Sequence, residues 1–242
     1  MALPAALAQL TPVLARAGVR IGVSEEEGEG LPLGVEGLDR LLPDHGLHRG
    51  GVVELAVKGP SGLLTSVALS AVRAVQREVQ GLGSGKMPWC AFVDPSLTLH
   101  APGVEAAGVS LDRLLVVRPS VEALNRVVIR LAESPAFSLV VVDTVGVPGR
   151  LLDVPLGTWS RLARRVSLAL DGTKRSVVLL TDAAVPRPLP LPVAQRIELE
   201  RDGEEKLIVR VAKDFRGRVT PPRSVVWARR PPPVEAVSVK AS

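Results

Sequence analysis

The chain has 242 residues, of which 46% are hydrophobic and 2% aromatic, and its formal net charge at pH 7 is +5. This length accommodates one large domain with appendages. The single cysteine, Cys90, excludes an internal disulfide framework, no apolar run reaches the length of a membrane span, and the N-terminus lacks the basic start of a signal peptide. We therefore expect a protein of the reducing cytoplasm, without membrane contact, whose core is built from valine, leucine and alanine.

The charge is distributed unevenly along the chain. Residues 206–242 contain nine lysines and arginines against two acidic residues, whereas residues 25–29 are mostly glutamate. A basic end is typical of a segment that meets nucleic acid or an acidic protein partner, and a solubilising tail has the same composition. Both interpretations stay open on charge alone.

The first segment carries an apolar stripe at helical spacing, made by Leu3, Leu7, Leu10 and Leu14. The stripe predicts a short amphipathic helix that packs either on the chain's own core or on a neighbouring protein. The acidic, glycine-bearing residues 24–30 follow and predict an exposed linker. Residues 1–30 are therefore the first of three expected units, an N-terminal helix with its linker.

Residues 31–227 form the second expected unit, in which strands alternate with helices. A short helix is expected at 35–42. It precedes a loop with His45 and His48, where the lack of further His or Cys argues against a metal site. Apolar runs predict strands at residues 52–57, 89–94, 114–119, 138–143 and 176–182. Apolar positions at helical spacing predict helices from residue 63, at 121–134 and at 158–170.

The pattern changes near the end of this unit. Residues 195–214 alternate apolar and polar side chains around Asp202–Gly203, which predicts a β-hairpin. The fold class is therefore α/β, with a mostly parallel central sheet flanked by helices and antiparallel strands at the C-terminal end of the sheet. The third unit, residues 228–242, contains three consecutive prolines and is expected to be a flexible Pro/Arg-rich tail.

Residues 51–80 have the layout of a phosphate-binding loop, a buried strand followed by a glycine-bearing turn and a helix. The complete motif needs a glycine, four residues, then Gly-Lys-Ser/Thr. When Gly62 is the second glycine, Leu63 stands at the lysine position and Leu64 at the Ser/Thr position. The ammonium and hydroxyl groups for phosphate and Mg²⁺ are thus missing. This degenerate phosphate loop comprises Lys58, Gly59, Ser61, Gly62, Leu63, Leu64 and Thr65.

Taken in order, these elements resemble the core domain of RecA-type recombinases from about residue 33 to residue 227. WCAFVDPS resembles the strand that delivers the catalytic glutamate of that family, and SLVVVDTVG resembles its Walker B strand. SVVLLTD resembles the strand before the second DNA-binding loop, and residues 197–222 resemble the paired strands that close the core. The joint order and spacing carry the resemblance, since each motif alone is weak.

The departures from this family fall on its catalytic positions. By resemblance, Ser96 stands where the catalytic glutamate is required, and Asp143 is the Walker B remnant. The second DNA-binding loop is reduced to the proline-rich residues 183–192, and the recombinase C-terminal domain has no counterpart. Hydrolysis needs phosphate positioning, metal coordination and water orientation. We therefore expect no enzymatic activity, no bound cofactor and no metal.

RecA-like chains with degenerate ATPase motifs include ImuA-type proteins and SulA-type cell-division inhibitors. The chain length, the HRGGVVEL segment and the Pro/Arg-rich end are more similar to the ImuA type. That resemblance implies a cytoplasmic, nucleoid-associated accessory protein of SOS mutagenesis. Its implied partners are RecA, the polymerase homologue ImuB and, indirectly, an error-prone replicative-type polymerase. Self-association into a homo-oligomer is a further possibility.

Three sets of residues are candidates for contacts. The leucine stripe is one, and the tail residues Arg229, Arg230, Pro231, Pro232 and Pro233 are another. Weak or indirect DNA contacts are assigned to a third set, Arg210, Lys213, Arg216, Arg218 and Arg223. Alternative functions are a SulA-like cell-division inhibitor, a DNA-binding RecA paralogue, and a nucleotide-binding paralogue in which Lys58 replaces the missing lysine.

Overall fold

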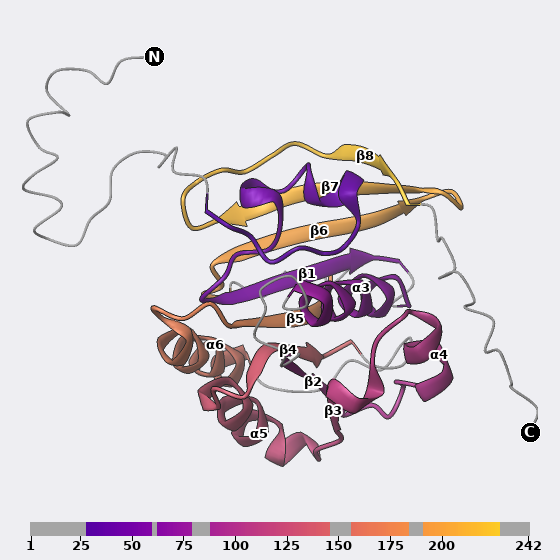
Figure 1. Ribbon diagram of the computed structural model, residues 1–242. Coiled ribbons are helices and arrows are strands. Elements are labelled where there is room, and N and C mark those ends of the chain that lie inside the picture. Colours follow the sequence, from indigo (N-terminus) through magenta and orange to yellow (C-terminus); the bar gives the residue numbers. More distant parts are fainter. Residues whose placement is uncertain (1–27, 60–61, 79–87, 146–155, 184–190, 228–242) are drawn as a thin grey trace, which may run out of the picture.

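The computed structural model describes residues 28–59, 62–78, 88–145, 156–183 and 191–227 (Figure 1). The N-terminal leucine stripe, Ser61 and the Pro/Arg-rich tail lie outside the described residues.

One eight-stranded sheet organises the described chain, with the strand order β3-β2-β4-β5-β1-β6-β7-β8 (Figure 1). All neighbouring pairs from β3 to β6 are parallel, whereas β6–β7 and β7–β8 are antiparallel. The predicted fold class is thus confirmed. The strands are β1 (Val52–Lys58), β2 (Trp89–Val93), β3 (Leu114–Val117), β4 (Phe137–Asp143), β5 (Ser176–Asp182), β6 (Gln195–Asp202), β7 (Lys206–Asp214) and β8 (Arg223–Val226).

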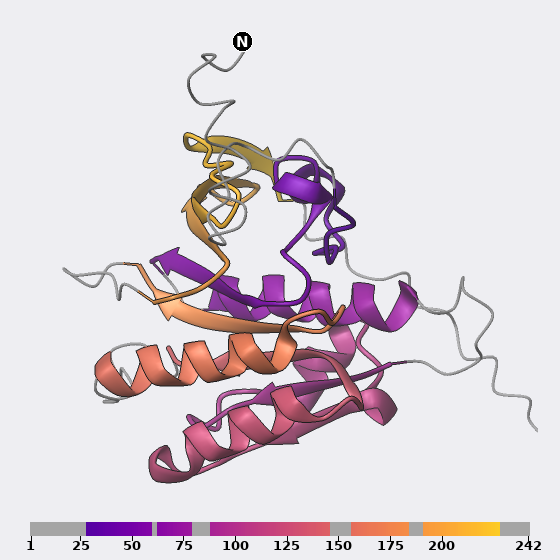
Figure 2. The ribbon, with the colours of Figure 1, turned by 90° about the vertical axis from the view of Figure 1, so that its left-hand side faces the viewer.

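Helices cover both faces of the parallel part of the sheet. On one face α3 packs against β1, β2, β4 and β5, and on the other α5 and α6 run side by side (Figure 2). The long helices are α3 (Gly62–Glu78), α5 (Val121–Glu133) and α6 (Leu156–Leu170). The short ones are α2 (Glu36–Asp39), η1 (Pro43–His45), α4 (Ala101–Ala106) and η3 (Leu111–Arg113).

Strand periodicity explains this layering. Successive side chains of a strand point to opposite faces. In β1, Val53 and Leu55 therefore join the core under α3, while Val52 joins the core under α5 and α6. Glu54 lies on the second face and is only 2% exposed, so a carboxylate occupies a position that the pattern assigns to a hydrophobic residue.

The structure differs from the sequence-based expectation in its short elements. The helix predicted over 35–42 is reduced to α2, because the backbone bonds after Arg40 tighten to the i→i−3 type, from the Leu41 N–H to Leu38 and from the Leu42 N–H to Asp39. Helix α4 and strand β8 were not predicted. Helix α4 has only six residues, too few to display a helical period, and β8 is a four-residue edge strand that exists through its pairing with β7.

Candidate functional site

The degenerate phosphate loop and the Walker B remnant lie at one edge of the sheet. In open α/β sheets, ligands bind outside the carboxyl ends of the parallel strands. Strand β1 ends at Lys58, Gly59 follows with a φ of 110°, and α3 begins at Gly62. Asp143 ends β4 and is in register with Leu180 of β5, which neighbours β1. The topology thus brings the loop and the carboxylate to the same edge.

The two leucines of the loop belong to the hydrophobic core. Leu63 is 7% exposed and Leu64 is 1% exposed, and both pack in the cluster formed by α3 and β1. Thr65 follows, half-buried, and the hydroxyl of Ser66 donates to the Gly62 carbonyl oxygen at 2.9 Å. The start of α3 is therefore used for packing where the complete motif would present polar groups to a phosphate.

A pocket of about 240 Å³ remains between the end of β1 and the start of α3. Leu63 and Trp227 give it apolar walls, and Lys58 and Arg201 are its cations. The Arg201 guanidinium already donates to the carbonyl oxygens of Gly203 and Glu204 at 3.1 Å each. Lys58 is exposed and remains the cation placed nearest the helix start.

The Walker B remnant supports the turn that follows it. Asp143 is 5% exposed, and its Oδ1 accepts the backbone N–H of Val145 at 3.0 Å. The next residue, Thr144, donates both its N–H and its hydroxyl to the Leu180 carbonyl oxygen, at 3.2 and 2.5 Å. This geometry gives Asp143 a local structural role at the end of β4.

The loop after β2 is organised by Asp94 rather than by Ser96. Asp94 is fully buried, and its carboxylate accepts the N–H groups of Thr98 and Leu99 at 2.9 and 3.0 Å. Arg118 lies 3.4 Å away through its Nε. Ser96, which the sequence resemblance predicts at the position of the catalytic glutamate, is half-buried in the turn that follows Asp94.

The comparisons with known proteins agree with this architecture. No protein-family model matches the chain. Protein RecA of Streptomyces ambofaciens is 31% identical over 193 residues, which are 74% of this chain and 50% of that protein. Protein RecA of Mesorhizobium japonicum is 34% identical over 194 residues, 74% of this chain and 51% of that protein. The chain has a RecA-like fold. It spans about half the length of the curated relatives it matches.

A buried polar track crosses the central strands of this RecA-like sheet. Glu54 of β1 accepts the Thr181 hydroxyl of β5 at 2.7 Å and lies 3.6 Å from the Arg196 guanidinium of β6. Arg196 and Arg210 of β7 each approach the Glu198 carboxylate, at 3.4 and 3.5 Å. Burial raises the pKa of Glu54, and Arg196 partly offsets that effect. The sequence signal for this track was a glutamate inside an apolar strand, and the prediction of that strand overlooked it.

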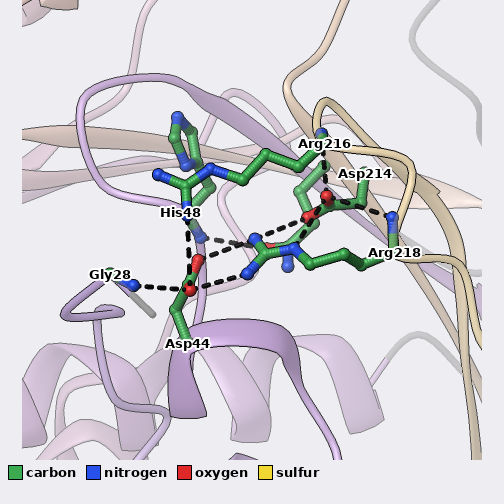
Figure 3. A network of polar contacts seen from close by, with 7 residues as sticks. Gly28, Asp44, His48, Asp214, Arg216 and Arg218 are labelled. Atoms are coloured by element: carbon green, nitrogen blue, oxygen red, sulfur yellow. Dashed lines mark hydrogen bonds and ion pairs between the residues drawn. The ribbon is translucent and has the colours of Figure 1, made fainter. Parts of the chain in front are cut away.

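Two of the predicted DNA-contacting residues enter an internal ion-pair network (Figure 3). The Arg218 guanidinium donates to both Asp44 oxygens at 2.7 Å and to both Asp214 oxygens at 3.2 Å. Arg216 lies 3.7 Å from Asp44, and the Gly28 N–H donates to Asp44 at 2.8 Å. The hydrogen bonds between Arg218 and Asp44 lower the pKa of Asp44 and raise the pKa of Arg218. This network ties the start of the RecA-like core to the turn after β7.

The other members of that set lie apart. The Lys213 ammonium donates to the Leu191 carbonyl oxygen at 3.2 Å, and the Arg210 side chain is 51% exposed beside Glu198. Arg223 is exposed on the edge strand β8. The structure therefore spreads the five cations over β7, its following turn and β8 rather than collecting them into one patch.

The described residues hold neither a membrane-spanning helix nor a metal cluster. Among the helices of the described ranges, none combines the length and the apolar character that a membrane span requires. In the same part of the chain, no three His, Cys, Asp or Glu side chains gather as metal ligands. His45 and His48 fall in this part, and His48 instead packs its ring 4.3 Å from that of Phe215.

Proposed function

We propose that this protein is a non-catalytic RecA-like accessory protein of DNA-damage-induced (SOS) mutagenesis. It acts through protein contacts with RecA and with the ImuB translesion complex, and through ImuB it reaches an error-prone replicative-type polymerase. The observation that carries the non-catalytic part is the burial of Leu63 and Leu64, at 7% and 1% exposure, where a phosphate loop presents its lysine and its Ser/Thr.

The chemistry of phosphoryl transfer supports this proposal. Catalysis there depends on positioned cations and metal ligands around the phosphates, and on a residue that orients the nucleophile. Buried leucines offer neither charge nor a metal ligand, Ser96 offers no carboxylate, and the Asp143 Oδ1 is already bonded to its own turn. A RecA-like protein that keeps the fold without these groups retains its surfaces, and surfaces serve partner recognition.

An ATP-turnover assay tests the catalytic part. We expect no hydrolysis above background by the purified chain, with or without single-stranded DNA. Turnover at the level of a RecA-type enzyme that Asp143→Ala abolishes would contradict the proposal. Binding of purified RecA and ImuB to the immobilised chain tests the second part, and failure to retain either partner would contradict it.

A nucleotide-binding paralogue is the second candidate, because Lys58 lines the pocket at the start of α3. The pocket volume of about 240 Å³ falls below the roughly 300–1,000 Å³ typical of small-molecule sites. Calorimetric titration with ADP and ATP separates the two functions. Saturable binding that Lys58→Ala removes would favour the paralogue.

A further inference from the structure

A groove of about 440 Å³ lies at the opposite edge of the sheet from the degenerate phosphate loop. Gly50 and Gly51, just before β1, form its floor, α6 forms one wall, and Phe215 after β7 forms the other. Two large apolar side chains that line the groove are exposed to solvent, Leu168 at 79% and Phe215 at 44%. Exposed apolar side chains that line one groove mark an interaction site.

The chain enters its described part beside this groove. The Gly28 N–H donates to Asp44, and Asp44 pairs with Arg218, three residues after Phe215 (Figure 3). On the other side, the Glu29 carboxylate lies 3.5 Å from the ammonium of Lys174, three residues after the groove residue Asp171. Residues 28 and 29 are therefore anchored to both flanks of the groove.

The preceding segment is long enough to reach the groove. Thirteen residues separate Leu14 from Gly28, and extended chain covers about 3.3–3.6 Å per residue, so the leucine stripe reaches the groove with slack. The last residues of that connection, Glu25, Glu26 and Glu27, come next to Gly28. Arg164 and Asp171 line the groove, and the flanking Lys174 and Arg216 lie 3.5 Å from Glu29 and 3.7 Å from Asp44. Charge is therefore balanced around the groove, and the length of the tether carries the match.

We propose that the N-terminal segment of the same chain folds back and seats its leucine stripe in this groove, against Leu168 and Phe215. The tether favours the chain's own segment over a second copy, because a short linker gives an effective concentration in the millimolar range. The stripe is then covered in the free protein, and a partner that binds the stripe competes with the groove.

Thiol labelling of the full-length chain tests this docking. Ser167→Cys places a probe in the groove with almost no change of volume, and Ser224→Cys on the exposed strand β8 is the matched control position. Burial raises the pKa of Cys90 to about 12, so the native thiol does not compete for a maleimide. We expect Leu7→Asp with Leu10→Asp to accelerate labelling at position 167 several-fold and to leave position 224 unchanged.

Matched variants decide the outcome. Ala5→Asp with Gln9→Asp places the same charges on the opposite side of the predicted helix and should leave labelling unchanged. The protection of position 167 should also be independent of protein concentration. Equal labelling rates in the two double variants, acceleration at both probe positions, or protection that grows with concentration would each overturn the proposal.

A change on the groove side gives a second test. Leu168→Asp alters a side chain that is 79% exposed, so the fold tolerates it. Release of the segment should speed trypsin cleavage after Arg16 and Arg20 several-fold. Leu97→Asp, at 65% exposure in the loop after β2, is the control and should leave cleavage unchanged. Equal cleavage in both variants would overturn the proposal.

Discussion

Leu64, which the sequence predicts at the Ser/Thr position of the phosphate loop, is a packing residue. Its side chain is 1% exposed and belongs to the core under α3. Truncating a buried leucine removes apolar contacts and leaves a cavity. Leu64→Ala should therefore lower the free energy of unfolding by about 2–5 kcal/mol in urea melts. Lys58→Ala, on an exposed neighbour, should change it by less than about 0.5 kcal/mol. Equal effects would contradict the placement of Leu64.

Arg218 is the residue on which the network at the start of the core depends. Arg218→Ala removes the guanidinium that hydrogen-bonds both Asp44 and Asp214, and Asp44 keeps only Arg216 at 3.7 Å, so the change should cost about 1.5–3 kcal/mol, the range for hydrogen bonds to charged groups. Arg223→Ala on β8 is the matched control and should stay within about 0.5 kcal/mol. Chemical denaturation at pH 7 measures both.

The effect of Arg218 should also depend on pH. Arg218 lowers the pKa of Asp44, so the pair contributes stability that is present above the unfolded-state pKa, near 3.8, and is lost as pH falls through the folded-state value. The difference in free energy of unfolding between the native chain and Arg218→Ala should shrink below about pH 4. A difference that stays constant from pH 7 to acid would contradict this linkage.

At the scale of elements, β8 marks where the described core ends. The Trp227 N–H donates to the Glu205 carbonyl oxygen at 2.6 Å, and Trp227 is 9% exposed. Residues 228–242 follow, with Arg229 and Arg230 before Pro231–Pro233. Proline-rich segments lose little entropy on docking, and arginine pairs with carboxylates or phosphates. We predict that this tail is part of a docking site for RecA or ImuB.

Truncation after Trp227 tests that role. The melting temperature should remain nearly unchanged, since Trp227 keeps its own contacts, and binding to the protein partner should fall measurably in a pulldown or interferometry assay. Unchanged binding of both partners would reduce the tail to a solubilising segment. Repeating the binding assay at higher salt distinguishes a protein partner from DNA as the ligand of the tail, because DNA binding would weaken steeply with salt.

At the scale of the whole molecule, the distribution of the basic side chains determines how strongly the protein should bind DNA. Two of the five residues predicted to contact DNA have internal partners: the Arg218 guanidinium binds Asp44 and Asp214, and Lys213 donates to Leu191. Arg210 and Arg223 lie exposed. Direct binding should therefore be weak. Two phosphate contacts on single-stranded DNA correspond to a slope of log K against log[salt] of about −1.4. Fluorescence anisotropy over a salt series measures it, and a slope of about −4 or steeper would contradict the expectation.

The sequence by itself determined the fold class and nearly all of the long elements, because side-chain period is a local property. The strands expected at 52–57, 89–94 and 176–182 match β1, β2 and β5 to within a residue. The loss of the phosphate-loop groups was also readable from residue identities. Residues 1–27 and 228–242 lie outside the described structure, so the partner-binding assignments there stay predictions.

The tertiary structure alone decided what each side chain contacts. Asp44 and Arg218 are 174 positions apart, and Glu54 and Thr181 are 127 apart, so no local period relates them. The same holds for the groove, whose walls come from α6 and from the turn after β7. Pairings of this kind arise when the sheet brings distant strand ends together. Until that happens, an arginine in a basic segment fits equally well as a DNA contact or as the partner of a buried carboxylate.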